Sequence, residues 1–171
     1  MRTELKVSID KELQLMNKLR DVLLSNSFDA SNVIILTVST DYSSVMGQYL
    51  RHQLTYNGEI CDGFGIDVPY PDQSFDNGFV KEICDMFNIH HKAIGNKTIL
   101  LVEAGVIRGG NYTKVVDIIK NQLNITQPVL TLTMYENIHS KWKSDFVGEY
   151  YNDEIEDLTF WWEKQNNHWV C

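Results

Sequence analysis

The stretch Asn96-Lys97-Thr98-Ile99-Leu100-Leu101-Val102-Glu103 decides the fold class of this 171-residue chain. The five residues from Thr98 to Val102 are apolar or β-branched and show no polar alternation, which predicts a central strand covered on both faces. Two further runs of the same kind extend from Val33 to Val38 and from Val129 to Met134. Because helical patterns separate the three runs, we expect neighbouring parallel strands in one sheet.

Segments with helical spacing fill the rest of the chain. Asp10 is predicted to cap a first helix that extends to about Leu24, Asn57-Gly58 to end a second, and Ser74 to cap a third. The inward side chains are expected to be Leu13, Met16, Leu19 and Leu23; Val45, Met46, Tyr49, Leu50 and Leu54; Phe79, Ile83, Met86 and Phe87; and Val115, Val116, Ile119 and Leu123. A short strand is predicted from Phe64 to Val68. Since no linker or repeat divides the chain, residues 1–171 are predicted to form a single α/β domain with a mainly parallel sheet flanked by helices.

Charge and composition exclude several classes of protein. The formal net charge is −8, so the basic surface typical of nucleic-acid binding is missing. No apolar run reaches the roughly 20 residues of a membrane span. The charged N-terminus, Met1 to Lys6, lacks the apolar core of a signal peptide, and the three cysteines are expected to be free thiols (Cys61, Cys84 and Cys171). These features predict a cytoplasmic protein.

The segment after the clearest strand, Glu103 through Asn111, is predicted to be a glycine-containing loop that leads into a helix. In open parallel sheets, ligands bind beyond the carboxyl ends of the strands. Gly109 and Gly110 allow close approach of the backbone, and the N–H groups of the helix N-terminus can bind an anion. Arg108, Asn111 and Thr113 could add side-chain donors. Two interpretations stay open: an anion site, or an ordinary strand-to-helix turn.

Residues 96–103 followed by Val106-Ile107-Arg108-Gly109-Gly110 resemble the phosphoribosyl-diphosphate signature of type I phosphoribosyltransferases. That signature is an apolar strand, two acids, a short apolar link and a Thr-Gly loop. The resemblance implies that Glu103 binds ribose hydroxyls and is the candidate catalytic residue. It also implies that residues 108–113 bind a 5′-phosphate, that Thr40 and Asp41 stand at the pyrophosphate loop, and that Mg²⁺ is the cofactor.

A second segment, Asp145-Phe146-Val147-Gly148, is similar to the base-binding segment of hypoxanthine and guanine phosphoribosyltransferases. The resemblance implies that the Phe146 ring stacks on a purine and that the Val147 backbone bonds the edge of the base. It places Asp153 where the family holds a second magnesium ion. The ending Thr159-Phe160-Trp161-Trp162-Glu163 resembles the Phe-Pro-Trp-Glu ending of the xanthine-guanine branch, which implies an aromatic and acidic C-terminal hood.

Departures from the family pattern leave two functions open. The second acid is Ala104, and Ile107 stands where the purine branch has its catalytic acid. Arg108 and Asn111 replace the threonines of the phosphate loop, and the purine-reading lysine has become Met134 or Tyr135. Ala and Ile can neither bind hydroxyls nor accept a proton. The chain is therefore either a divergent nucleobase phosphoribosyltransferase or an inactive member of the fold that binds a nucleotide, phosphoribosyl diphosphate or a protein partner.

Three other groups of residues favour structural roles. His90-His91 with Cys84 has no standard metal spacing and is typical of a solvated loop. The acids of residues 153–157 favour a solvated turn over a magnesium site. The four tryptophans, which lie late in the sequence, favour packing in the core or at a subunit interface, which leaves a homodimer open (Trp142, Trp161, Trp162 and Trp169).

Overall fold

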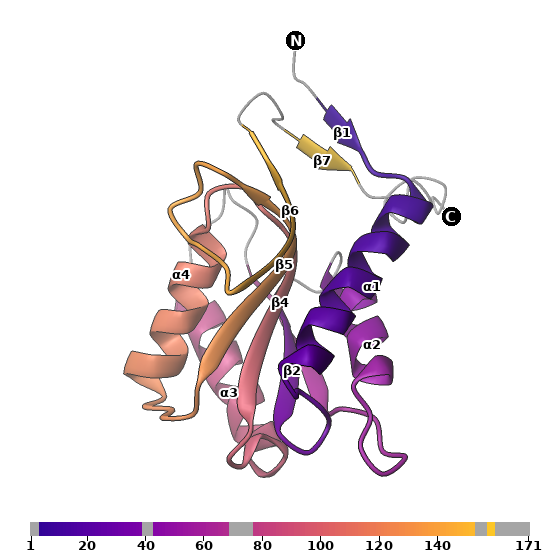
Figure 1. Cartoon of the computed structure of the whole chain (residues 1–171). Helices are drawn as coiled ribbons and strands as arrows, with labels where there is room; N and C mark the ends of the chain where they lie inside the picture. Colours follow the sequence, from indigo (N-terminus) through magenta and orange to yellow (C-terminus); the bar gives the residue numbers. More distant parts are fainter. Residues whose placement is uncertain (1–3, 39–42, 69–76, 153–156, 160–171) are drawn as a thin grey trace, which may run out of the picture.

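The chain forms one α/β domain around a five-stranded, fully parallel sheet (Figure 1). The structure is a computed structural model that describes residues 4–38, 43–68, 77–152 and 157–159. The strands, in spatial order, are β3 (Gly63–Ile66), β2 (Val33–Val38), β4 (Thr98–Val106), β5 (Val129–Asn137) and β6 (Phe146–Tyr151). The predicted α/β class and mainly parallel sheet are confirmed.

The three strands predicted to be neighbours are the centre of this sheet. Val33 pairs with Thr98, and Ile99 pairs with Val129, both in parallel register. All six residues of β2 are buried, as expected for a strand covered on both faces. β4 and β5 are longer than predicted, because their pairing continues as far as Val106 and Glu136.

Helices cover both faces of the sheet, as Figure 1 shows. The helices α1 (Ile9–Ser25) and α2 (Ser43–Gln53) pack on one face, and α3 (Asn77–Ile94) and α4 (Gly110–Asp117) on the other. A π-helical turn, η1 (Ile118–Gln122), extends α4. Two hydrophobic cores result, one on each side of the sheet.

Several local predictions were wrong. Ser8, not Asp10, caps α1, because its Oγ accepts a hydrogen bond from the N–H of Lys11 at 3.3 Å. Leu13 is 43 % exposed, since the buried face of α1 turns Leu15 inward instead. His90 and His91 lie on α3, not in a loop, and the His90 ring stacks on Phe64.

Other differences concern the second helix and the short strand. α2 ends at Gln53, before Asn57-Gly58, and these two residues form the turn of a small bridge between Tyr56 and Glu59. Val45 is 38 % exposed although an inward position was predicted. β3 ends at Ile66 and not at Val68. The predicted cap Ser74 lies outside the described residues.

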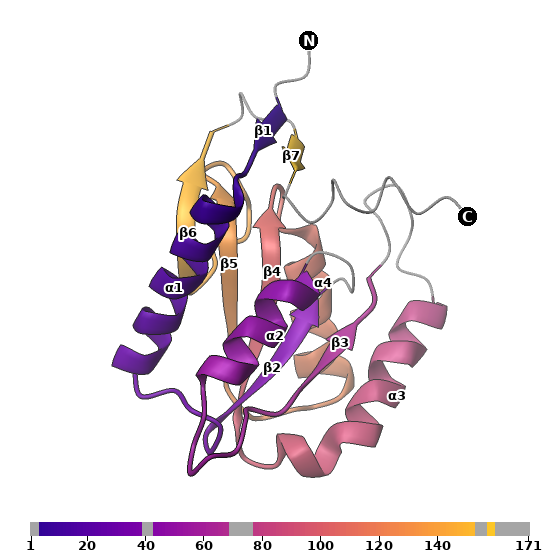
Figure 2. The ribbon, with the colours of Figure 1, turned by 90° about the vertical axis from the view of Figure 1, so that its right-hand side faces the viewer.

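A small second sheet lies beyond the carboxyl ends of the main strands (Figure 2). It pairs β1 (Glu4–Lys6) with β7 (Asp157–Thr159) in parallel, so the two ends of the described chain meet there. The position agrees with a hood over this edge, although most of the predicted hood, residues 153–156 and 160–163, lies outside the described residues. In the part of the chain that the structure describes, no helix combines the length and apolar character needed to cross a membrane.

Candidate phosphate site at the N-terminus of α4

Glu103 lies within β4 and not in a loop, which corrects the predicted loop from Glu103 to Asn111. The strand continues to Val106, and Glu103 pairs with Thr133 of β5. The half-buried Glu103 carboxylate accepts a hydrogen bond from Nδ2 of Asn111 at 3.1 Å. Burial raises the pKa of Glu103 to about 8, and the Asn111 bond lowers it only in part. The protonated form of Glu103 is therefore favoured more strongly than in an exposed glutamate.

The N-terminus of α4 follows directly from the end of β4. Gly109 is the N-cap residue and has a left-handed φ of 76°, which favours glycine. A side chain at Gly110, by contrast, would meet no heavy atom within 4 Å. Arg108 is exposed, and the Thr113 hydroxyl is engaged with the Gly109 carbonyl at 2.9 Å. The predicted phosphate residues therefore lie together at one helix N-terminus, with open space at Gly110.

The β5–β6 connection, residues 138–145, forms a wall beside this turn that sequence reasoning missed. A Cβ at Gly109 would lie 2.2 Å from Cβ of Trp142 and 2.9 Å from Oγ of Ser140. Trp142 also lies against the side chain of Tyr112 in the first turn of α4, with ring centroids 5.8 Å apart. The sequence offers only a weak signal, a tryptophan that needs packing partners, because Tyr112 and Gly109 lie 30 and 33 residues away from Trp142.

Asp145, from the segment that resembles the base-binding motif, holds this connection in place. Its carboxylate accepts hydrogen bonds from the N–H and hydroxyl of Thr131, at 2.7 and 3.0 Å. The Trp142 indole N–H donates to the same hydroxyl at 3.2 Å. The role of Asp145 in the described structure is therefore to fold the connection back onto β5.

The two positions that depart from the family pattern have different surroundings. Ala104 is 1 % exposed and lies in the core beneath α2, and its N–H donates to Oγ of the buried Ser43 at 3.2 Å. Ser43 in turn donates to the carbonyl of Val38 at the end of β2. Ile107 is 43 % exposed in the turn before α4. A carboxylate at position 104 would thus be buried among apolar groups, whereas one at position 107 would reach solvent.

The remaining predicted site residues do not join this cluster. Phe146 packs edge-on against Phe28, with centroids 6.1 Å apart, on the face of the sheet covered by α1. Glu103 faces α4 on the other side. Met134 and Tyr135 are buried in the same core as Phe146. Val147 pairs with Thr133 at the edge of the sheet. Thr40, Asp41 and Asp153 lie outside the described residues.

The described part of the chain shows no preformed site for Mg²⁺, the cofactor that the family resemblance implies. Mg²⁺ prefers six oxygen ligands and usually takes at least one charged carboxylate. Among the described residues, no three His, Cys, Asp or Glu side chains lie close enough to hold a metal ion. Glu103 is one carboxyl group, it is bonded to Asn111, and its raised pKa disfavours the charged form.

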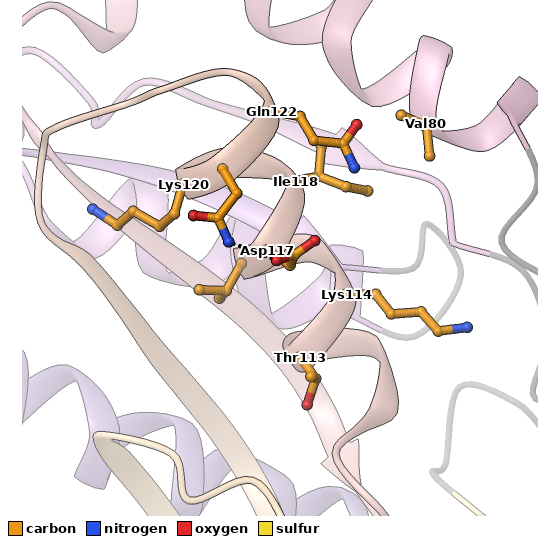
Figure 3. A pocket seen from close by; sticks show the side chains of 9 residues that line it. Val80, Thr113, Lys114, Asp117, Ile118, Lys120 and Gln122 are labelled. Atoms are coloured by element: carbon orange, nitrogen blue, oxygen red, sulfur yellow. Dashed lines mark hydrogen bonds between the residues drawn. The ribbon is translucent and has the colours of Figure 1, made fainter.

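A separate open hollow of about 560 Å³ lies along the outer side of α4 and η1 (Figure 3). Val80 of α3 lines one side, and Lys114, Asp117 and Lys120 are among the polar residues on the other. Asp117 accepts a hydrogen bond from Asn121 at 2.6 Å within this lining. Thr113 alone links the hollow to the predicted phosphate residues, so the hollow is distinct from the turn at Gly109 and Gly110.

The parallel sheet, its two helical layers and the strand–turn–helix at β4 and α4 define the class: the fold is that of type I phosphoribosyltransferases. No family model matches the sequence, and no curated protein matches it either. The fold is therefore established by comparison with solved structures.

Three such structures span nearly the whole chain. The first is purine phosphoribosyltransferase from Pyrococcus horikoshii, with a TM-score of 0.64, 14 % identity and 93 % coverage of both chains. The second is xanthine-guanine-hypoxanthine phosphoribosyltransferase from Helicobacter pylori, with a TM-score of 0.62, 15 % identity and 96 % coverage of both. The third is a hypothetical protein from Neisseria gonorrhoeae with bound ppGpp, with a TM-score of 0.63, 12 % identity, and coverage of 98 % of this chain and 96 % of that one.

Proposed function

We propose that this protein binds a purine nucleotide and holds its 5′-phosphate at the N-terminus of α4. The observation that carries the proposal is the turn at Gly109 and Gly110, where a Cβ on Gly110, the first residue of α4, would meet no heavy atom within 4 Å. Free N–H groups and the helix dipole attract an anion there. Exposed Arg108 adds a guanidinium suited to a phosphate, in a chain whose net charge is −8.

The kinds of protein that share the fold support the same ligand class. Two of the similar structures are purine phosphoribosyltransferases, and the third holds ppGpp, a guanine nucleotide. Glu103 lies on the same side of the sheet as α4, where a ribose attached to the phosphate would reach it. A protonated carboxyl can donate one hydrogen bond and accept another, so Glu103 suits a ribose hydroxyl without a metal ion.

Ordinary purine salvage activity is expected to be absent or very weak. Ala104 and Ile107 supply neither a second ribose ligand nor a catalytic acid. Losing general acid–base assistance typically costs about 10²–10⁴-fold in rate. The assay combines purified protein, Mg²⁺, phosphoribosyl diphosphate and hypoxanthine, guanine or xanthine. Turnover of about one per second, within the ordinary range for enzymes, would contradict this part of the proposal.

One observation favours a second candidate, a divergent nucleobase phosphoribosyltransferase. The pKa of Glu103, about 8, lies near neutral pH, where a group can both donate and accept protons. In that case the turnover rate depends on pH through one group with a pKa of about 8, and Glu103→Gln abolishes turnover. A nucleotide-binding protein without activity shows binding and no turnover.

Substitution of Gly110 tests the phosphate site directly. Gly110→Asp adds a negative charge where nothing blocks the side chain, and an acid in the first turn favours the helix. We expect folding to be kept and affinity for guanosine 5′-monophosphate to fall at least about tenfold, equivalent to about 1.4 kcal/mol. Gly110→Asn is the matched neutral control and should bind within about threefold of wild type. Equal affinity of the two variants in calorimetry would contradict the site.

A further inference from the structure

We propose that Trp142, on the β5–β6 connection, is a positioning residue that holds Gly109 in its left-handed conformation and thereby sets the anion affinity of the α4 N-terminus. The inference rests on the proposed function, because it concerns the same site. Trp142 is not among the residues proposed to bind the phosphate. It acts through the backbone of Gly109, the N-cap residue of α4.

The first contact is between Trp142 and the α-carbon of Gly109. A Cβ on Gly109 would lie 2.2 Å from Cβ of Trp142 and 2.9 Å from its backbone nitrogen. The connection therefore lies directly against the turn, with no room for a side chain between them. The Trp142 N–H donates to Oγ of Ser140 at 3.2 Å, which keeps this part of the connection compact.

Trp142 is in turn fixed from two directions. Its indole N–H donates to the Thr131 hydroxyl in the buried part of β5, and that hydroxyl also bonds Asp145. Its ring lies against Tyr112, whose hydroxyl donates to the carbonyl of Leu132 at 2.6 Å. Trp142 thus connects the interior of β5, the first turn of α4 and the α-carbon of Gly109.

The consequence for ligand binding follows from the geometry of the N-cap. Anion binding depends on the direction of the first N–H groups of α4, and the conformation of Gly109 sets that direction. Glycine has little intrinsic preference for a left-handed φ over other conformations. Trp142→Ala keeps the Cβ and backbone nitrogen that lie against Gly109, so the indole acts indirectly, by anchoring the connection to Thr131 and Tyr112. Without the indole the connection can shift, Gly109 can move away from 76°, and the N–H groups then no longer converge. Affinity falls although no group that touches the ligand has changed.

The test compares Trp142→Ala with Trp142→Phe, using guanosine 5′-monophosphate and inorganic phosphate as probes in calorimetry. Trp142→Ala should raise the Kd for both probes at least about tenfold, about 1.4 kcal/mol. Trp142→Phe keeps a ring against Tyr112 and loses only the bond to Thr131, so it should restore most of the affinity. Thr131→Val removes this acceptor and also the hydrogen bonds between the Thr131 hydroxyl and Asp145, so the connection loses more anchors than in Trp142→Phe and affinity should fall further. This variant gives a second route if Trp142→Ala does not fold.

A spectroscopic measurement separates positioning from a general loss of structure. Binding of guanosine 5′-monophosphate should change tryptophan emission in the wild-type protein, and Trp142→Phe should lose that change while it still binds. Wild-type affinity in a folded Trp142→Ala protein overturns the inference. The inference is also overturned when Thr131→Val binds with wild-type affinity and the emission change persists in Trp142→Phe. If wild type itself binds neither probe, the proposed function fails, and the inference fails with it.

Discussion

Glu103→Gln is the substitution that tests the electrostatics of the site most sharply. The pKa of Glu103 rises from its ordinary value of 4.5 to about 8 because the carboxyl group is buried. The folded protein therefore binds this proton more tightly than the unfolded chain does. Its contribution to stability is complete below about pH 4.5, decreases as the pH rises, and is lost above about pH 8.

The magnitude follows from the size of the shift. At about 1.4 kcal/mol per pH unit, a shift of this size corresponds to at most about 5 kcal/mol. Glu103 is half-buried, and solvent screening lowers the value to about 2 kcal/mol. Glutamine resembles the protonated acid and can still accept the Asn111 bond, so it avoids this cost. Glu103→Gln should thus be about 2 kcal/mol more stable than wild type at pH 9, and close to it at pH 5.

The assay is thermal unfolding of both proteins from pH 5 to pH 9. For a domain of this size, about 2 kcal/mol corresponds to a Tm difference of about 4–8 °C. Other titrating groups change both proteins equally, so the difference between them isolates Glu103. A Tm difference that is constant with pH would refute the raised pKa. Nucleotide binding at pH 7 should survive the substitution, because glutamine can donate and accept the same hydrogen bonds as the protonated acid.

Two further substitutions test the surroundings of the site. Ala104→Asp restores the acid pair of the family pattern but buries a carboxyl group in the core. We expect this variant to lose about 3 kcal/mol of stability in urea unfolding and to show no turnover. A stable, active variant would show that position 104 opens to solvent. Ser43→Ala should cost about 1–3 kcal/mol, because the N–H of Ala104 and the carbonyl of Val38 both lose a partner, and an unchanged unfolding midpoint would contradict this role.

The central part of the fold could be predicted from the sequence, because the signals were local. β2, β4 and β5 are continuous apolar runs between helical patterns, and that pattern has few alternatives to a parallel sheet. The ends of the strands could not be predicted. Glu103 was predicted in a loop and Glu136 lies beyond the predicted strand end at Met134, but pairing between β4 and β5 includes both in strands.

The candidate site was predictable only in part. The glycines and donors of residues 108–113 are contiguous, so the sequence indicated them directly. The contact between Gly109 and Trp142 joins residues 33 positions apart and leaves no local pattern. This contact also decides which of the two glycines can be substituted to test the phosphate site. Any side chain at Gly109 would collide with the connection and disturb folding, whereas Gly110 has space and reports on the ligand alone.

A crystal structure of the protein with guanosine 5′-monophosphate tests the central claim most directly. The 5′-phosphate should lie at the N-terminus of α4, within about 3 Å of the backbone N–H groups of Gly110 and Asn111, since charge-assisted hydrogen bonds have about that length. The ribose should lie on the Glu103 side of the turn. A phosphate bound in the hollow along η1 or elsewhere on the protein, with the α4 N-terminus free, would contradict it.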